Sequence, residues 1–262
     1  MLQRRINRTF AWAFRLDLSE AEKRPEEYAS LSAFFVRGLR EGTRSWPTNP
    51  MAPGSPADGV LGPLGRLERG TALQAKGITY GVAELLGDSE LPEFQSGLFL
   101  TIYLSPRHYH RVHTPCRVQL HTARVIPGRL LPVHPAATRL QKGLLTGNER
   151  LVTLMESNRV SLAVVAIGAC NVGSISADFD PDWETVSGRG VTNRAGGRVV
   201  TRSYIPARML NPGDPLASFY LGSTVVVLIG EGGGGRAELH SGLQVGREVR
   251  VGAPILAGLL GD

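Results

Sequence analysis

The chain has 262 residues, of which 42% are hydrophobic, and a formal net charge of +6. This length and apolar content exclude a disordered chain and allow a sizeable core. The 32 glycines and 17 prolines exclude a helical bundle, because its helices would be broken too often, and they favour strands and loops. Cys116 and Cys170 are too few for a disulfide framework or a paired-cysteine zinc site, so we expect both to be reduced and buried.

The positive charge is carried almost wholly by arginine and is compatible with nucleic acid or an anionic membrane surface. No basic motif contains the interleaved aromatic side chains that bind single-stranded nucleic acid, so we expect the membrane surface and no nucleic acid. No signal peptide is visible, and the longest apolar run, at 162–169 and its flanks, is far below the roughly 20 residues of a spanning helix. We therefore expect a peripheral protein on the cytoplasmic face of the cell membrane.

Residues 1–16 predict a basic amphipathic helix, with apolar positions such as Leu2, Ile6 and Phe10 near one face and several arginines elsewhere. Such a helix either lies in the interface of an anionic membrane or packs on the protein's own core. We expect an N-terminal helical segment over 1–28 and a β-rich domain over 29–262. A second helix is predicted over 30–40 from the helical spacing of its apolar residues.

Several later segments alternate apolar and polar residues or are continuously apolar, which predicts strands. The fold class that follows is α+β, with a mainly antiparallel β-sheet sandwich or barrel-like core and a few N-terminal helices. We also expect a glycine-turned hairpin over 245–256 that closes the sandwich. The predicted strands cover 98–104, 116–125 and 151–155, with a strand pair over 162–175.

Two polar segments precede the chemistry-bearing part of the sequence. Asp58 stands before Gly59, and such an aspartate commonly closes a turn by binding nearby amides. His108, His110 and His113 lie within one short loop, which indicates acid-base chemistry or a metal site. No nearby carboxylate or cysteine completes a familiar ligand set, and Arg111 would repel a cation, so we expect no metal.

The apolar run 217–229 predicts a strand that is interrupted by Gly222 and Ser223. A glycine inside a strand marks a bulge, a tight bend or a close approach to the backbone. The Ser223 hydroxyl can reach the carbonyl carbon of Gly222, so this serine could attack its own chain. The alternative is a strand that tolerates two small residues beside a neighbour. The Arg- and Gly-rich segment 187–198 predicts an exposed loop that covers a site or contacts phosphate.

Asp58, the two imidazoles of His110 and His113, and Ser223 are the components of a catalytic triad. A triad is defined by geometry and roles, so the order of its members in the sequence does not exclude it. Esterases with a nucleophile elbow carry Gly-x-Ser-x-Gly at a strand-to-helix turn, whereas Ser223 here continues into strand residues. An ordinary serine hydrolase is therefore disfavoured.

With these residues in place, the chain resembles the phosphatidylserine decarboxylases, a pyruvoyl-dependent family whose members cut themselves. The resemblance extends over most of the chain and rests on eight blocks in the family's order. They are Phe34-Phe35-Val36-Arg37, Pro56-Ala57-Asp58-Gly59, Gln74-Ala75-Lys76-Gly77, Tyr103-Leu104-Ser105-Pro106-Arg107, Tyr109-His110-Arg111-Val112-His113, Asn148-Glu149-Arg150, Val172-Gly173-Ser174-Ile175 and Leu221-Gly222-Ser223-Thr224.

The resemblance implies that Ser223 attacks the carbonyl of Gly222, giving a large chain 1–222 and a small chain 223–262 that begins with a pyruvoyl group derived from Ser223. It implies that His113 acts as the base and Asp58 orients it, and that His110 returns a proton after carbon dioxide leaves. Decarboxylation requires an electron sink that unmodified side chains do not offer, and the pyruvoyl cofactor supplies it. The implied substrate is phosphatidylserine, and we also expect a homo-oligomer.

Three alternatives remain at this stage. The first is a related pyruvoyl decarboxylase that acts on another serine-headed lipid or an amino acid. The second is a serine hydrolase or inactive relative that does not cut itself. The third is a biotinyl or lipoyl carrier, suggested by the hairpin at 245–256, but it lacks a modifiable lysine because no lysine follows Lys142.

Overall fold

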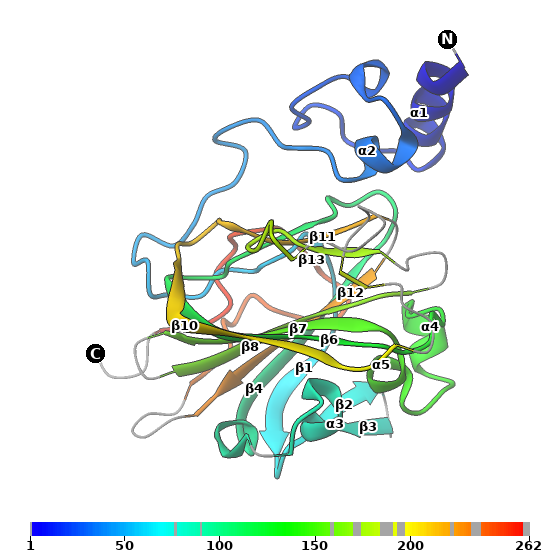
Figure 1. The fold of residues 1–262 in the computed structure, drawn as a ribbon. Helices are drawn as coiled ribbons and strands as arrows, with labels where there is room; N and C mark the ends of the chain where they lie inside the picture. Colours follow the sequence, from blue (N-terminus) through cyan, green and yellow to red (C-terminus); the bar gives the residue numbers. More distant parts are fainter. Residues whose placement is uncertain are drawn as a thin grey trace.

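A computed structural model describes residues 2–75, 78–89, 91–157, 160–169, 174–183, 191–192, 197–220, 223–231 and 237–258. Antiparallel strands form most of the molecule, and short helices lie at its N-terminus and between strands (Figure 1). The expected α+β class with a sandwich-like core is confirmed. The main sheet is open, because its order begins at one strand and ends at another, so the described strands close no barrel.

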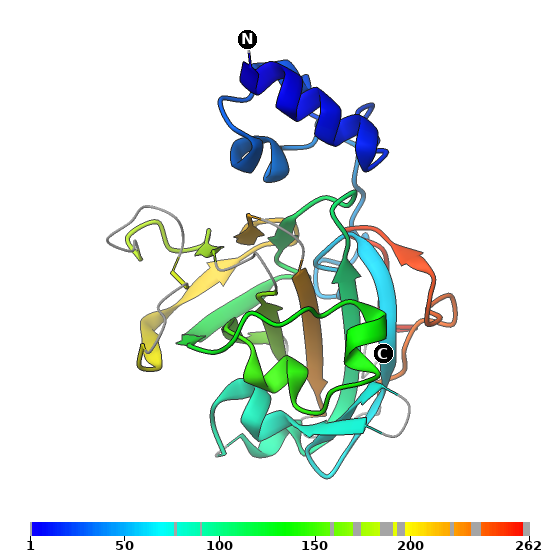
Figure 2. The same ribbon diagram turned by 90° about the vertical axis from the view of Figure 1, so that its right-hand side faces the viewer.

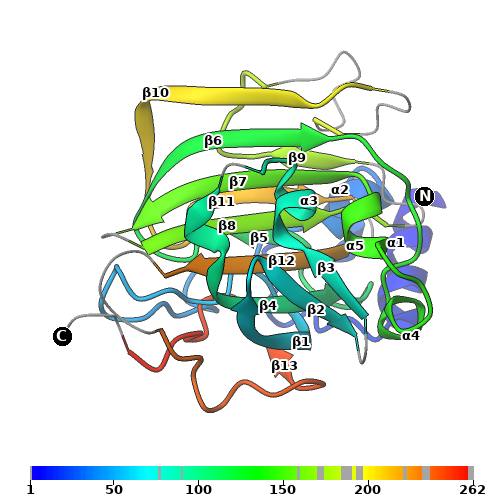
Figure 3. The same ribbon diagram turned by 90° about the horizontal axis from the view of Figure 1, so that it is seen from below.

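The main sheet has ten strands in the order β10-β6-β7-β8-β12-β4-β1-β2-β3, and β13 pairs with β1 (Figure 3). Its central strand β12 (Ser223–Gly230) is buried along its whole length between β4 and β8. β-branched side chains fill this strand, as suits a fully buried sheet position. The other strands are β1 (Gly59–Glu68), β2 (Thr71–Ala75), β3 (Ile78–Gly81), β4 (Ser96–Leu104), β6 (Val118–Ile126), β7 (Arg150–Ser157), β8 (Val160–Ile167), β10 (Val200–Leu210) and β13 (Glu248–Val249).

A second sheet has three strands in the order β5-β11-β9. They are β5 (Arg111–His113), β11 (Pro215–Phe219) and β9 (Ile175–Ala177). The apolar run predicted as one strand over 217–229 is therefore two strands, β11 in the small sheet and β12 in the main sheet. The chain changes sheets between Phe219 and Ser223, so the interruption at Gly222 and Ser223 falls at the crossing between two layers.

The N-terminal segment lies apart from the sheets, at one end of the molecule (Figures 1 and 2). It contains α1 (Leu2–Ala13), the 3-10 helix η1 (Pro25–Glu27) and α2 (Leu31–Phe35). The predicted first helix is confirmed, but its buried residues are Asn7 and Ala11. Ala11 belongs to a small cluster with Leu16 and Phe34, so α1 packs on α2. Its predicted apolar stripe is left largely uncovered.

Three segments differ from the sequence predictions. The helix expected over 30–40 ends at Phe35, and Leu39 instead forms an isolated bridge with Ala21. The strands expected to pair within 162–175 are β8 and β9, which belong to different sheets. The hairpin expected over 245–256 is wrong, because its one described strand, β13, pairs with β1 and the segment continues as isolated bridges to Gly54 and Leu239.

The remaining helices are short: α3 (Val82–Leu86), η2 (Pro92–Phe94), α4 (Pro135–Thr138) and α5 (Leu144–Gly147). Within the described ranges, no helix is both long and apolar enough to cross a membrane. Cys116 is a buried free thiol, as expected, and burial raises its pKa to about 11. Cys170 lies outside the described residues.

Candidate active site

Ser223 is the first residue of β12 and is fully buried. Its register partner in the main sheet is Leu104, the last residue of β4. The Ser223 Oγ has no hydrogen-bond partner among the described residues. A buried hydroxyl without a partner costs free energy, and a catalytic role is one of the explanations for leaving it so. Gly222 and Leu221 lie outside the described residues.

His110 is also fully buried, in the loop between β4 and β5. Its Nδ1–H donates to the carbonyl oxygen of His108 at 2.9 Å, which leaves the lone pair on Nε2, and Nε2 has no partner among the described residues. Burial lowers the pKa of His110 to about 3, so the imidazole is neutral at pH 7. The ring also packs against Phe35 of α2, with ring centroids 4.1 Å apart. His110 therefore presents a free proton acceptor in a dry environment.

His113, at the end of β5, has both ring nitrogens occupied. Its Nδ1–H donates to the carbonyl oxygen of Gly213 at 2.8 Å, and its Nε2 accepts from the Tyr109 hydroxyl at 2.9 Å. Burial lowers the pKa of His113 and raises that of Tyr109 to about 12, so the phenol stays protonated as the donor. Gly213 has φ +87°, and a Cβ there would lie 2.9 Å from Trp46 Nε1, so only glycine fits at this carbonyl.

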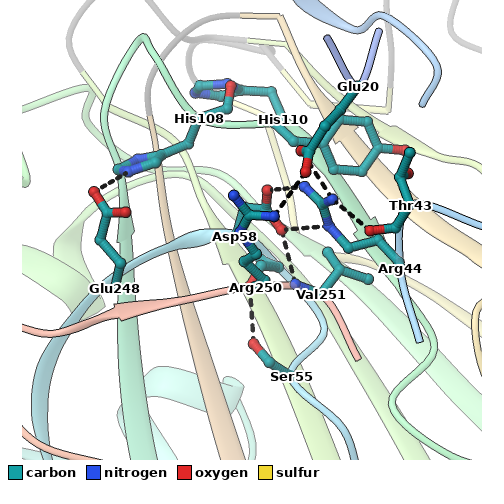
Figure 4. Close-up of polar contacts among 12 residues, drawn as sticks. Glu20, Thr43, Arg44, Ser55, Asp58, His108, His110, Glu248, Arg250 and Val251 are labelled. Atoms are coloured by element: carbon teal, nitrogen blue, oxygen red, sulfur yellow. Dashed lines mark hydrogen bonds and ion pairs between the residues drawn. The ribbon is translucent and has the colours of Figure 1, made fainter. Parts of the chain in front are cut away.

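Asp58 lies just before β1 and does not close a local turn. Its carboxylate accepts from Arg44 through Nε at 3.2 Å and Nη2 at 2.5 Å, and from the Val251 amide at 2.7 Å (Figure 4). Arg44 also donates to Glu20 at 2.9 Å, and Glu20 accepts from Arg250 at 2.7 Å. We call Arg44, Asp58, Glu20 and Arg250 the ionic cluster. It joins the N-terminal segment to both ends of the β-rich part.

The structure brings some of the expected site residues together and leaves others apart. The amide of Phe219 donates to the carbonyl of His110 at 2.9 Å, whereas His113 is the register partner of Pro215, further from Ser223 along the chain. Burial lowers the pKa of His110 most, and the main chain of Leu104, the register partner of Ser223, acts in the opposite direction and raises it. Within the described part of the chain, no hydrogen bond joins Asp58 to His113 or His113 to Ser223.

Sequence reasoning missed the partners of these residues. Tyr109 could have been found from its place beside His110, because a tyrosine next to a loop histidine can hold its neighbours in orientation. Arg44 carried no local signal, since its carboxylate partners come from separate segments. The expected loop over 187–198 lies mostly outside the described residues.

The sequence of this chain matches a known family. The sequence model of the phosphatidylserine decarboxylase family matches residues 31–257, which include Asp58, His110, His113 and Ser223. A phosphatidylserine decarboxylase proenzyme of Halorhodospira halophila is 43% identical over 254 residues, covering 96% of this chain and 82% of the relative. One from an Anaeromyxobacter species is 40% identical over 254 residues, covering 95% and 85%. One from Myxococcus xanthus is 40% identical over 222 residues, covering 84% and 76%.

These similarities define the class as decarboxylases made as proenzymes. The chain belongs to the phosphatidylserine decarboxylase family.

Proposed function

We propose that this protein cuts itself between Gly222 and Ser223 and then converts phosphatidylserine to phosphatidylethanolamine and carbon dioxide. Membership of the family supports the reaction, and the proenzyme names of the relatives support self-processing. The observation that carries the proposal is the buried Ser223 Oγ at the start of β12, which has no partner among the described residues and belongs to the residue that directly follows Gly222 in the sequence. Ser157 Oγ is also buried without a described partner, but Ser157 follows no glycine.

In the first stage, the Ser223 Oγ attacks the carbonyl carbon of Gly222 and converts the peptide bond to an ester. Elimination then releases the chain 1–222 with a carboxylate on Gly222 and leaves an unsaturated residue at position 223. Water hydrolyses this residue, ammonia leaves, and 223–262 keeps a pyruvoyl group as its new N-terminus. We assign His113 as the base for this attack and Asp58 as the group that stabilises its protonated form. The Tyr109 hydroxyl occupies His113 Nε2 in the described arrangement, so it must release this lone pair before the base can act.

The second stage depends on a pyruvoyl group formed from Ser223, which supplies the electron sink for loss of carbon dioxide. The surroundings of Ser223 fit such a group, because the residue is fully buried and held at a fixed position in the sheet. We assign His110 as the residue that carries a proton to the product. It is neutral at pH 7, so its Nε2 accepts a proton before it donates one. Burial around both residues excludes bulk water from competing as the acid.

We further propose that α1 contacts an anionic membrane, which places the protein at the cytoplasmic face as a peripheral enzyme. Leu2 and Trp12 on α1 are 74% and 81% exposed, and Ile6 and Phe14 are also uncovered. A cavity of about 910 Å³ lies between α1 and the segment that ends in η1, lined by apolar residues and by charged residues of both signs, with basic residues in excess. Exposed aromatic and aliphatic side chains beside arginine are typical of helices that lie in an anionic interface.

Intact mass of the purified protein, combined with assay of carbon dioxide release from phosphatidylserine, tests the proposal. Wild type should give two chains and release carbon dioxide, whereas Ser223→Ala should give one chain and none. Ser157→Ala is the matched control, because Ser157 is another buried serine of the main sheet, and it should cut as wild type does. An uncut wild-type chain that still releases carbon dioxide would contradict self-processing. An uncut chain that releases none would favour a serine hydrolase or an inactive relative.

A further inference from the structure

A second cavity, of about 190 Å³, lies beside Asp58 between the N-terminal segment and the loop that follows β4. Charged side chains dominate its wall, and Arg37, Arg44, Arg107 and Arg250 are among them. Tyr109 also lines the cavity, and its hydroxyl contacts His113. The cavity is therefore adjacent to the residues of the proposed reaction.

Most of the arginines on this wall have a carboxylate partner. Arg44 and Arg250 are neutralised within the ionic cluster, by Asp58 and Glu20. Arg107 forms an ion pair with Glu248. The charges of the Glu20, Asp58 and Glu248 carboxylates are thus offset by arginines. Asp17 and the exposed Arg15 complete the charged wall.

Arg37 differs from these residues, because it is only 3% exposed and no ion pair is formed to it within the described part of the chain. Its Nη2 makes two long hydrogen bonds, at 3.4 and 3.3 Å, to the neutral carbonyls of Arg107 and His108. Its Nε and Nη1 have no partner among the described residues. Burial lowers the pKa of Arg37, as expected for a cation without a counter-ion.

A buried guanidinium with free donors costs stability unless an anion completes it. Its planar, forked donors match the oxygens of a phosphate better than a point charge would. A phosphodiester is the anion that the proposed substrate brings, and its phosphorus is three bonds from the carbon that loses carbon dioxide. The phosphate must therefore bind close to the reacting carbon. The cavity reaches His108, whose carbonyl oxygen accepts from both the His110 imidazole and Arg37, so Arg37 lies beside the residue assigned to proton transfer.

We propose that this cavity is the phosphodiester subsite of the enzyme, and that Arg37 binds the headgroup phosphate. The proposal rests on the proposed function for the identity of the ligand. The phosphodiester does not change between the bound substrate and the transition state, so Arg37 binds both equally, and such uniform binding lowers KM without changing kcat. Arg37 is thus a specificity-determining residue for diesters of phosphoric acid.

The test compares Arg37→Met and Arg37→Lys with wild type on a monomeric short-chain phosphatidylserine, after gels show that each variant is fully cut. KM should rise about tenfold or more in Arg37→Met, with kcat changed by less than about threefold. Arg37→Lys should fall between them, because it keeps the charge and loses the fork. Arg247→Met is the matched control, since Arg247 is exposed and outside the cavity, and its KM should equal that of wild type.

Direct binding makes the subsite measurable without catalysis. Glycerophosphoethanolamine, a phosphodiester without acyl chains, should bind the uncut Ser223→Ala chain in calorimetry, and adding Arg37→Met should abolish this. Inorganic phosphate should bind more weakly, which separates a headgroup site from a general anion site. If wild type releases no carbon dioxide but this Arg37-dependent binding persists, the proposed function fails and the subsite stands.

An unchanged KM in a fully cut Arg37→Met enzyme would overturn the subsite, and so would equal binding of inorganic phosphate and the diester. If Arg37→Met fails to fold, wild type alone decides the matter. Its kcat/KM should fall about tenfold or more when the phosphate of the short-chain substrate is methylated to an uncharged triester. Equal use of diester and triester by wild type would rule the proposal out.

Discussion

Buried polar groups are paired in the ionic cluster, whereas around Ser223 and His110 some have no partner among the described residues. Around Asp58, the carboxylates of Asp58 and Glu20 are matched by Arg44 and Arg250, and a main-chain amide adds a further bond. At the start of β12 and in the loop between β4 and β5, the Ser223 Oγ and the His110 Nε2 are both buried and have no partner within the described ranges. An unmade hydrogen bond to a buried group costs about 1–3 kcal/mol. Pairing thus stabilises the first region, while the second keeps reactive atoms free at a cost in stability.

We expect the largest effects on self-cleavage and carbon dioxide release when the imidazole of His113 or of His110 is removed. His113→Ala should leave the chain uncut, because Ser223 loses its base. His110→Ala should still cut, but carbon dioxide release should fall about 100-fold or more, as expected for loss of a proton-transferring group. A gel time course and the carbon dioxide assay read the two stages separately.

His121→Ala serves as the control, because His121 is exposed on β6 and should change neither stage. An uncut His110→Ala chain would show that the roles are exchanged. The alternative to our assignment is therefore that His110 is the base for cutting. It has a reason in the structure, because Nε2 of His110 has no partner among the described residues, whereas both ring nitrogens of His113 are hydrogen-bonded.

The next largest effect should be a loss of stability when the ionic cluster loses Arg44. Arg44→Gln, made in the Ser223→Ala background so that the chain stays whole, should lower the free energy of unfolding by about 3 kcal/mol. The reason is that Asp58 and Glu20 lose their shared cation while their side chains stay mostly buried. Urea unfolding measures this change. Adding Asp58→Asn should recover part of the loss, and a loss below about 1 kcal/mol would show that the cluster is not what holds Asp58.

The free energy of unfolding should depend on pH through the buried imidazole of His110. An unfolded His110 takes up a proton near pH 6.5, while the folded residue does so only near pH 3, so acid favours the unfolded chain. Its contribution to stability is therefore complete above pH 6.5 and falls by about 1.4 kcal/mol per pH unit below it. Urea unfolding of Ser223→Ala at pH 7.5 and pH 5 should show the loss, and adding His110→Gln should reduce it. An equal slope in both chains would contradict the burial of a neutral imidazole.

The smallest effect concerns an ion pair at the rim of the cluster. Arg107 and Glu248 have side chains that are 52% and 60% exposed, so water already solvates both charges. Arg107→Gln should change the free energy of unfolding by no more than about 0.5–1 kcal/mol. Urea unfolding, compared with Arg44→Gln under the same conditions, checks the contrast. A loss as large as that of Arg44→Gln would remove the distinction between rim and cluster.

Much of the sheet could be predicted from the sequence, because alternation over 98–104 and 116–125 depends only on local residue types, and β4 and β6 match it closely. Pairing could not be predicted in the same way. The segment 245–256 contains the glycines of a hairpin, yet its strand β13 finds β1, almost 200 positions earlier in the chain. Helix α2 ends at Phe35 although helical spacing continues, because Leu39 is taken by the bridge to Ala21.

The site shows the same division. Asp58, His110, His113 and Ser223 could be picked from the sequence, because each stands in a segment that resembles the family. Their partners could not, since Arg44 and the Val251 amide reach Asp58 only through tertiary contacts. The unpartnered state of Ser223 and His110 is likewise a property of the packed structure and leaves no trace in the spacing of residues.

The position of Ser223 has a consequence for the matured molecule. If the chain is cut before Ser223, as proposed, β12 stays hydrogen-bonded between β4 and β8, and β13 stays paired with β1. The amide of Val251, which would belong to the shorter product, still donates a hydrogen bond to the Asp58 carboxylate of the longer one. The two fragments should therefore behave as a single body that comes apart only on denaturation, and the newly made terminus needs no separate anchor to stay in place.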